Sequence, residues 1–207
     1  MLNFNKARWT TLCAAAGATS LASYYEEILA RYSEGHRAYH NALHIDECLA
    51  EFDSARSNAQ HPTTVEFAIW FHDIIYDPRS NNNEAQSAGL ANAYLGLVSA
   101  PLAEHVAELI ITTKSHEPAS VQDSPLLLDI DLSILGRNRE RFREFENGIR
   151  SEYAWVPFEI YRSKRAEILR GFLNRKRIYV TNSFHDRYEA TARHNLLQLI
   201  ADLEKAS

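Results

Sequence analysis

The chain has 207 residues, of which 45% are hydrophobic and 11% aromatic, enough to bury a substantial core as one domain. Its formal net charge of -5 gives no electrostatic footprint for long nucleic acid, and no stretch approaches the roughly 18 apolar residues of a membrane span, so neither partner is expected. Cys13 and Cys48 are its only cysteines, and their spacing fits neither a disulfide framework nor a thiolate zinc site, so we expect a reduced, cytoplasmic setting.

Apolar residues recur at helical spacing throughout the chain, whereas the alternation typical of strands is nearly absent. Seven glycines and six prolines leave few tight turns, which also favours long helices. In chain order we expect helices at about residues 5–16, 20–32, 40–52, 61–76, 84–97, 101–115, 124–136, 139–153, 158–173 and 186–203. The sequence therefore predicts an all-α protein.

The helix expected at about residues 40–52 carries two histidines. His40 and His44 are four residues apart, so on a helix they project from neighbouring turns of one face. This spacing resembles the zinc helix of metalloproteases, but Asn41 occupies the motif position next to the first histidine and cannot act as their glutamate base, which excludes a protease. The apolar side chains expected to face the core are Leu43, Cys48, Leu49 and Phe52. The acidic side chains expected to face water are Glu47, Glu51 and Asp53.

The next expected helix begins at His61-Pro62, ends before Pro78 and is apolar on nearly all sides, as a central buried helix would be. His72 and Asp73 lie within its apolar sequence, where an unpaired charge would be strongly unfavourable. A metal ion is the simplest partner for this doublet. A hydrogen-bonded His-Asp pair that only supports packing is the alternative.

Imidazole and carboxylate groups together suit a borderline or hard divalent ion and leave coordination positions for water, which can ionise near neutral pH and attack phosphorus. Asp129 and Asp131 are two residues apart, so on a helix they point about 160° from each other and only Asp131 is expected to bind. The predicted ligands are His44, His72, Asp73 and Asp131. This set does not distinguish Mn, Mg, Zn, Fe, Co or Ni.

The ligand set resembles that of the HD superfamily of metal-dependent phosphohydrolases, helical proteins named for their His-Asp doublet. The run from Tyr39 to His44 is also similar to the start of the catalytic domain in cyclic-nucleotide phosphodiesterases of that superfamily. There the first histidine is the general acid toward the leaving oxygen and the second binds metal, which implies His40 as the acid and His44 as a ligand. The purine-gripping glutamine of those enzymes has no counterpart that can be placed in this shorter chain, so cyclic-nucleotide hydrolysis is not implied.

A closer similarity is to a small bacterial group of predicted HD phosphohydrolases, and it covers about residues 30–200. The matching positions are Arg37, Tyr39-His40-Asn41, His44, Phe71-His72-Asp73, Tyr76-Asp77, Asn83-Glu84, Ser87, Thr113, His116, Asp129-Ile130-Asp131-Leu132, Gly136, Phe172-Leu173 and Tyr179. The His-Asp-x-x-Glu-Asp run of alarmone hydrolases is absent, because Ile74-Ile75 follows the doublet. The resemblance implies a single HD-type helical domain over residues 1–207, with the metal-site core at about 37–136 and helices over 138–205 packed on it.

Five further residues are candidates for supporting roles. Glu84 is a candidate catalytic residue that orients water or acts as base, and a carboxylate favoured by the helix dipole is the alternative. His116 is a candidate substrate contact or ligand of a second metal, with an ordinary surface histidine as the alternative. Arg37 and Lys114 are candidate phosphate-binding groups, although solvated or structural salt bridges explain them equally well. Asp77 is a candidate partner of a ligand histidine, or simply ends a helix.

These features predict a metal-dependent hydrolase of a small phosphate ester, such as a nucleotide or a related monoester or diester. The reaction would be attack of a metal-bound water while His40 protonates the leaving group. A non-catalytic metal-containing module that senses a nucleotide is one alternative. An HD-type di-iron oxygenase, in which His116 completes a second metal site, is another. The expected partner is a small phosphorylated substrate, and the sequence is compatible with a homodimer.

Overall fold

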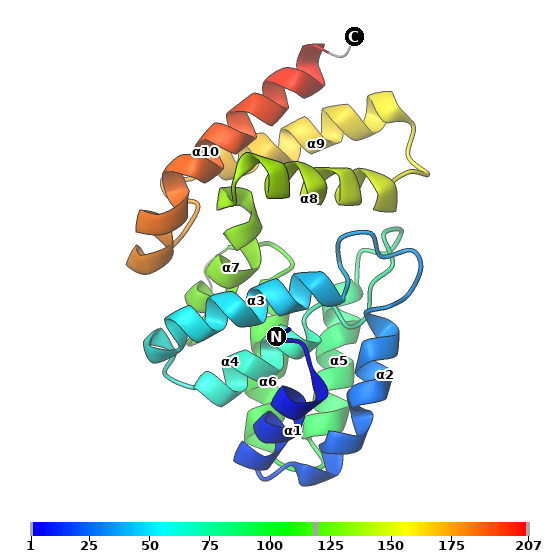
Figure 1. Ribbon diagram of the computed structural model, residues 1–207, viewed down its shortest axis with the longest axis vertical. Helices are drawn as coiled ribbons and strands as arrows, with labels where there is room; N and C mark the ends of the chain where they lie inside the picture. Colours follow the sequence, from blue (N-terminus) through cyan, green and yellow to red (C-terminus); the bar gives the residue numbers. More distant parts are fainter. Residues whose placement is uncertain (1, 118–119, 206–207) are drawn as a thin grey trace. The chain divides into compact units, whose positions relative to one another are not determined.

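The computed structural model describes residues 2–117 and 120–205 (Figure 1). Within these ranges lie ten α-helices and no β-strand, so the all-α prediction is confirmed. The chain divides into two compact units, Met1–Ile130 and Asp131–Ser207. The expected packing of residues 138–205 on a core of residues 37–136, as a single domain over residues 1–207, stays a prediction. In the described ranges, no helix combines the length and apolarity needed to cross a membrane.

The first unit is built from consecutive helices joined by short loops. Their bounds are α1 Lys6–Ala15, α2 Tyr25–Arg31, α3 Ala42–Ala55, α4 Pro62–Phe71, α5 Asn83–Leu95, α6 Ala100–Thr112 and α7 Ser124–Asp131, with short 3-10 helices at Thr19–Tyr24 and Arg56–Asn58. Helix α6 packs against both α4 and α5, and α3 packs against α4. The last residue of α7 is also the first residue of the second unit.

Helix α4 supplies the centre of the first unit. A proline at its start has the fixed φ that a first helical turn accepts, and every residue from Thr64 to Phe71 is buried. The Trp9 ring of α1 lies with its centroid 5.7, 5.2 and 5.9 Å from the rings of Phe67, Trp70 and Phe71. A central buried helix is therefore confirmed, but its expected extent is wrong, because α4 ends at Phe71 and leaves the His72-Asp73 doublet in the turn that follows it.

Ionic hydrogen bonds tie the helices around α4 together. The guanidinium of Arg8 on α1 donates to both carboxylate oxygens of Asp53 on α3, at 2.7 Å each, and to Glu66 on α4, also at 2.7 Å. The carboxylate of Asp123 accepts the backbone N–H groups of Gln60 and His61 at 2.9 and 2.8 Å. Because His61 makes no side-chain cap of its own, Asp123 satisfies donors at the start of α4 from a distant loop.

Helix α3 begins later than expected. The side chain of Asn41 accepts the backbone N–H of Leu43 at 2.9 Å and so acts as the N-cap, which places the first helical residue at Ala42. His40 therefore lies outside the helix. The expectation that His40 and His44 project from one helix face is wrong.

Two side chains of α3 exchange the environments expected for them. Leu43 is 49% exposed, because it shares a face with Glu47 and Ala50, four and seven positions further along. Glu51 is only 3% exposed, because it lies seven positions after the buried His44. The remaining core predictions for this helix are confirmed by burial of Cys48, Leu49 and Phe52.

The second unit consists of three helices and one short 3-10 helix. Their bounds are η3 Leu132–Gly136, α8 Arg139–Glu152, α9 Phe158–Leu173 and α10 Asn182–Lys205. The helix expected over residues 124–136 is therefore α-helical in its first part and 3-10 in its second, and the last helix begins before residue 186. Helix α10 packs against both η3 and α9.

The contact between η3 and α10 depends on a glycine and a buried amide. A Cβ atom placed on Gly136 would lie 2.5 Å from the Cβ of Tyr188, closer than two carbon atoms can approach. The buried Asn195 side chain donates to the carbonyls of Leu135 and Arg137 at 2.9 Å each. Glycine thus allows the backbones to meet, and the amide satisfies the carbonyls at the end of η3.

Candidate metal centre

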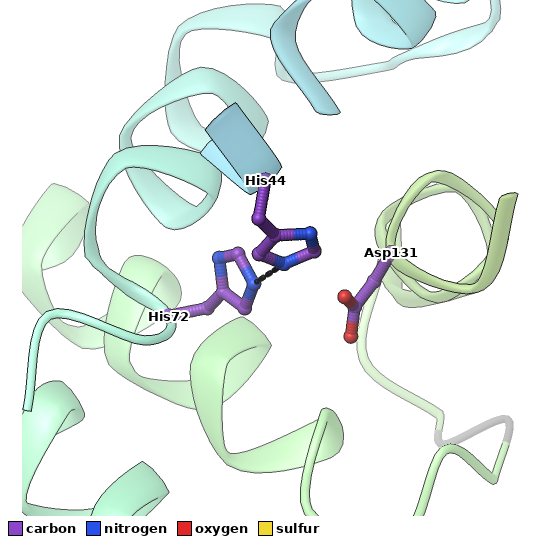
Figure 2. Close-up of side chains that lie close together, drawn as sticks. All are labelled: His44, His72 and Asp131. Carbon is purple, nitrogen blue, oxygen red and sulfur yellow. Dashed lines mark hydrogen bonds between the residues drawn. The ribbon is translucent and has the colours of Figure 1, made fainter. Parts of the chain in front are cut away.

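Two buried histidines, one in α3 and one at the end of α4, meet where these two helices pack together. His44 lies in the first turn of α3, and His72 is the C-cap of α4. Their Nε2 atoms are 3.1 Å apart and face each other, as Figure 2 shows. Each residue is 2% exposed. Because burial removes both rings from water, the two nitrogens need a common partner or a hydrogen bond to each other.

Asp73 adds a carboxylate oxygen to this pair. Its Oδ2 atom lies 3.2 Å from His72 Nε2 and 3.5 Å from His44 Nε2. Nitrogen and oxygen ligands bind zinc at about 2.0 to 2.2 Å, so two ligands of one tetrahedral ion are about 3.3 to 3.6 Å apart. The separations of 3.1, 3.2 and 3.5 Å observed here lie within about 0.2 Å of that range. The donor set of two imidazoles and a carboxylate therefore fits one divalent ion in both chemistry and spacing.

The ring orientation of His72 is fixed from its other side. His72 Nδ1 lies 3.0 Å from the backbone carbonyl of Ile69, one turn back in α4. A carbonyl oxygen only accepts hydrogen bonds, so Nδ1 carries the proton and the lone pair of the neutral ring lies on Nε2. This second hydrogen bond is the arrangement that orients a metal-binding histidine.

A third helix brings Asp131 toward the two histidines. Ligand atoms of His44, His72 and Asp131 all lie within 4.8 Å of one another (Figure 2). Asp131 is the final residue of α7 and directly follows Ile130, whose side chain is fully buried in the first unit. Among the described residues, a group of His44, His72 and Asp131 could hold a metal ion. Neither Asp129, two residues earlier, nor Asp73 is in this group, so the predicted ligand Asp73 joins the two histidines only through its own 3.2 and 3.5 Å contacts with them.

The electrostatics of the doublet favour an ionised Asp73. Burial alone would raise the pKa of this carboxyl, but attraction to the His72 imidazole when that ring is protonated, with smaller effects of His40 and of hydrogen bonds from His44 and His72, outweighs it. The net result is a pKa well below the usual range for aspartate. Asp73 is therefore a carboxylate at neutral pH, which is the form that binds a cation.

His40 lies next to this cluster in the loop before α3. Its ring stacks on Tyr76 with centroids 4.2 Å apart, and it meets Tyr39 edge to face at 5.0 Å. The centroid of the His44 ring is 6.0 Å away. The two aromatic neighbours restrict the rotation of the imidazole and hold it beside the candidate ligands. The loop position therefore brings His40 near the site although the expected helix face does not exist.

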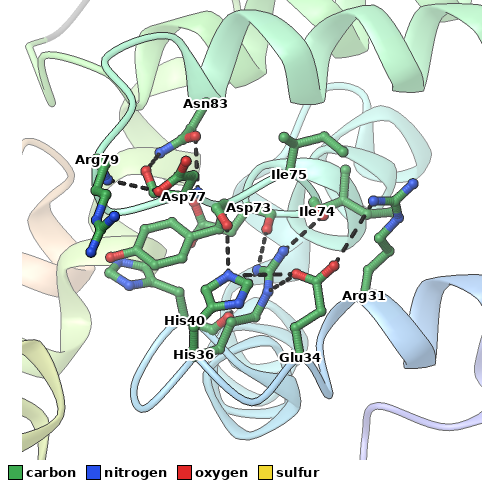
Figure 3. Close-up of polar contacts among 12 residues, drawn as sticks. Arg31, Glu34, His36, His40, Asp73, Ile74, Ile75, Asp77, Arg79 and Asn83 are labelled. Carbon is green, nitrogen blue, oxygen red and sulfur yellow. Dashed lines mark hydrogen bonds and ion pairs between the residues drawn. The ribbon is translucent and has the colours of Figure 1, made fainter. Parts of the chain in front are cut away.

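Arg37 occupies a different place from the one expected for a phosphate-binding group. Its side chain is fully buried and donates to the backbone carbonyls of His40, Asp73 and Ile74. Its Nε also donates to a carboxylate oxygen of Glu34 at 2.9 Å. Figure 3 shows these acceptors side by side. This is the structural role that the sequence left open beside phosphate binding.

The other candidate residues belong to the first unit, and their local contacts are as follows. Glu84 is half-buried in the first turn of α5, and the Lys114 ammonium donates to the carbonyl of Asn81 at 2.6 Å. His116 has a φ of 49°, in the left-handed region that few non-glycine residues adopt. The carboxylate of Asp77 accepts the backbone N–H of Arg79 at 2.9 Å (Figure 3). Their parts in catalysis or binding stay predictions.

Ser87 and Tyr76 shape the site, although the resemblance named them only as matching positions and gave them no role. Ser87 of α5 is fully buried, and its hydroxyl accepts the N–H of Ile75 at 3.1 Å and lies 3.3 Å from the carbonyl of the same residue. Tyr76 provides the ring on which His40 stacks. A serine among the apolar and small residues of a helix, and a tyrosine soon after the doublet, were the available sequence signals.

Comparison with protein-family models, with curated proteins and with solved structures found no match for this chain. Membership of the HD superfamily therefore stays a prediction from the motifs. The donor atoms of His44, His72 and Asp73 are the features of this chain that bear most directly on function.

Proposed function

We propose that this protein is a metal-dependent phosphohydrolase of the HD type that acts on a small phosphate ester, such as a nucleotide. The main support is the convergence of His44 Nε2, His72 Nε2 and Asp73 Oδ2 within 3.1 to 3.5 Å of one another. These donors come from α3 and from the end of α4, so the fold, and not one local turn, assembles them. A group of His44, His72 and Asp131 supports a further carboxylate ligand.

Four of these residues are proposed to hold the metal ion. His44, His72, Asp73 and Asp131 would hold a divalent ion, which when bound polarises a phosphoryl oxygen and lowers the pKa of a water molecule. The bond from His72 to the Ile69 carbonyl keeps the proton on Nδ1 and leaves the Nε2 lone pair as the donor that would hold the ion. Asp73 contributes negative charge because its pKa is low.

His40 is the proposed general acid. A protonated imidazole can transfer its proton to the oxygen of the leaving group, and the stacked Tyr76 ring holds it in one orientation. His40 lies beside the group of His44, His72 and Asp131 and is not part of it. The substrate is accordingly proposed to bind with its phosphorus toward the ligands and its leaving oxygen toward His40.

The test combines metal analysis with turnover. Freshly purified protein is assayed for bound metals and for hydrolysis of a phosphomonoester, a phosphodiester and a nucleoside triphosphate. We expect wild-type protein to bind a divalent ion and hydrolyse at least one substrate, and His72→Ala and Asp73→Asn to lose both properties. His105→Ala, which changes another histidine of the first unit on α6, is the matched control and should retain both.

Three results would overturn the proposal. Turnover by a metal-free Asp73→Ala protein would show that the ligands are not needed. Two irons per chain with an oxygen-dependent reaction would identify an oxygenase instead. Nucleotide binding with normal affinity in both wild type and His40→Ala, without turnover on any substrate, would identify a sensor module.

A further inference from the structure

The guanidinium of Arg37 connects two chain segments that are far apart in sequence. Its Nη1 atom donates to the carbonyl of His40 at 3.0 Å and to that of Asp73 at 2.6 Å, and its Nη2 atom donates to Ile74 at 2.9 Å. One nitrogen therefore contacts the backbones of the proposed general acid and of a proposed metal ligand. The side chain is fully buried while it does so.

We propose that Arg37 is a positioning residue that fixes His40 and Asp73 relative to each other and does not bind phosphate. This inference rests on the proposed function, since it assigns Arg37 a task within the same site. A phosphate-binding arginine directs its fork of N–H groups at the ligand. Here three of the five N–H groups are directed at backbone carbonyls, and a fourth, Nε–H, donates to Glu34.

The surroundings of Arg37 offset the cost of burying its charge. Glu34 supplies a carboxylate oxygen 2.9 Å from Nε. The rings of Tyr32 and Tyr76 lie 5.2 and 5.6 Å from the central guanidinium carbon, close enough for cation–π attraction. Planar shape and donor geometry both matter in this environment, so a lysine cannot replace the arginine equivalently.

Arg37 also acts on His40 by a second route. The Tyr76 ring that it contacts is the ring on which His40 stacks, with centroids 4.2 Å apart. The guanidinium thus holds both the backbone of His40 and the surface that orients its imidazole. Loss of this support should displace His40 and Asp73 together, which lowers metal affinity and proton transfer without removing any group that touches the substrate.

The experiment uses Arg37→Lys in the full chain, with Arg8→Lys as the matched control. Arg8 is also largely shielded and carboxylate-paired in the first unit, but it bonds Asp53 and Glu66 and no residue of the site. Cobalt(II) is titrated into each metal-depleted protein, and its visible absorption reports coordination. We expect Arg37→Lys to bind cobalt about 10-fold or more weakly with altered absorption, as for other residues that support metal ligands, and Arg8→Lys to match wild type.

Steady-state kinetics at saturating metal then separate positioning from phosphate binding. We expect Arg37→Lys to lower kcat while KM changes little. A raised KM with unchanged kcat and unchanged cobalt affinity would overturn it, because that pattern belongs to a substrate contact. Circular dichroism checks folding. If Arg37→Lys does not fold, Glu34→Gln tests the same idea, because it weakens the ion pair with Arg37 while the bonds from Arg37 to the backbone carbonyls remain.

Failure of the proposed function gives a different result from failure of this inference. If wild-type protein neither binds metal nor turns over, the proposed function fails. Positioning is then read from proton NMR of the His40 and Tyr76 rings, whose signals should shift in Arg37→Lys and not in Arg8→Lys. Unchanged ring signals in Arg37→Lys would overturn the positioning role itself.

Discussion

The side chains of the consecutive residues His72 and Asp73 converge, with Nε2 and Oδ2 3.2 Å apart. Neighbouring side chains within an α-helix point about 100° apart, so the rotation of the two side chains about their own bonds brings these atoms together. Helix α4 ends at Phe71, and His72 is its C-cap, with φ and ψ of -58° and -36°. The end of α4 is therefore as much a part of the candidate site as the doublet itself.

Asp73→Glu should separate charge from geometry at this position. The substitution retains the carboxylate but moves its oxygens by about one bond length relative to His44 and His72. Since a displacement of about 1 Å can cost a factor of about 10² in rate, we expect a drop of that order in kcat/KM. The measurement is hydrolysis at saturating metal. Glu at exposed Asp53 is the matched control, and equal activity of Asp73→Glu and wild type would contradict the assigned ligand geometry.

Ser87→Ala should weaken the turn that follows the doublet. The buried hydroxyl bonds Ile75 through its N–H and lies within hydrogen-bonding distance of its carbonyl. Its removal leaves these groups without that partner, which we expect to cost about 1 to 3 kcal/mol. Urea denaturation followed by circular dichroism measures the change. Ser23→Ala removes an exposed hydroxyl that bonds only the Ser20 carbonyl at 3.1 Å, and it should change stability far less.

Gly136→Ala should destabilise the second unit. The added methyl would meet the Cβ of Tyr188 at 2.5 Å, and overpacking of this kind costs about 1 to 3 kcal/mol. Gly171→Ala is the matched control, because Gly171 lies within α9 with nothing within 4 Å of the new methyl. Alanine there should stabilise by about 0.5 to 1 kcal/mol. Thermal unfolding distinguishes the two, and a loss of stability in both variants would contradict the steric account.

Cys13 should make the stability of the protein depend on pH in the alkaline range. Burial raises the pKa of this thiol from 9.0 to about 11. The folded state therefore retains a proton that the unfolded state has lost, so the contribution of Cys13 is complete below about pH 9 and disappears as pH rises through about 11. Urea denaturation at pH 8 and pH 10.5 should show a steeper loss in wild type than in Cys13→Ala. Parallel losses in the two proteins would disprove the link to Cys13.

Helical periodicity was sufficient to predict the class of this fold, because the apolar positions of α4 and its neighbours repeat at the required spacing. The start of α3 was also available in the sequence, since asparagine is a preferred N-cap and Asn41 precedes Ala42. The end of the helix expected at residues 61–76 was harder to predict, because apolar residues continue beyond Phe71 and give no sign that the helix ends there. Hydrophobic pattern marks burial but not the point at which a buried chain stops being helical.

The ligand group could be anticipated from residue type, whereas the structure around it could not. A histidine and an aspartate in apolar sequence need partners, which leads directly to His72 and Asp73. Arg37 gives no such signal, since a single arginine is compatible with phosphate, carboxylate or carbonyl partners. Its contacts with Asp73 and Ile74 cross 36 and 37 positions of sequence and exist only once α3 and α4 have paired.

That long separation has a consequence for the folding of the protein. A hydrogen bond that closes a loop of more than 30 residues restricts the conformational entropy of the whole intervening segment. Such a bond should form after the local helices and their first contacts. We therefore expect the hydrogen bonds from Arg37 to the carbonyls of Asp73 and Ile74 to be absent from the folding transition state. Substitutions of Arg37 should accelerate unfolding and leave the folding rate almost unchanged, so these bonds would govern how long the assembled site persists before it opens.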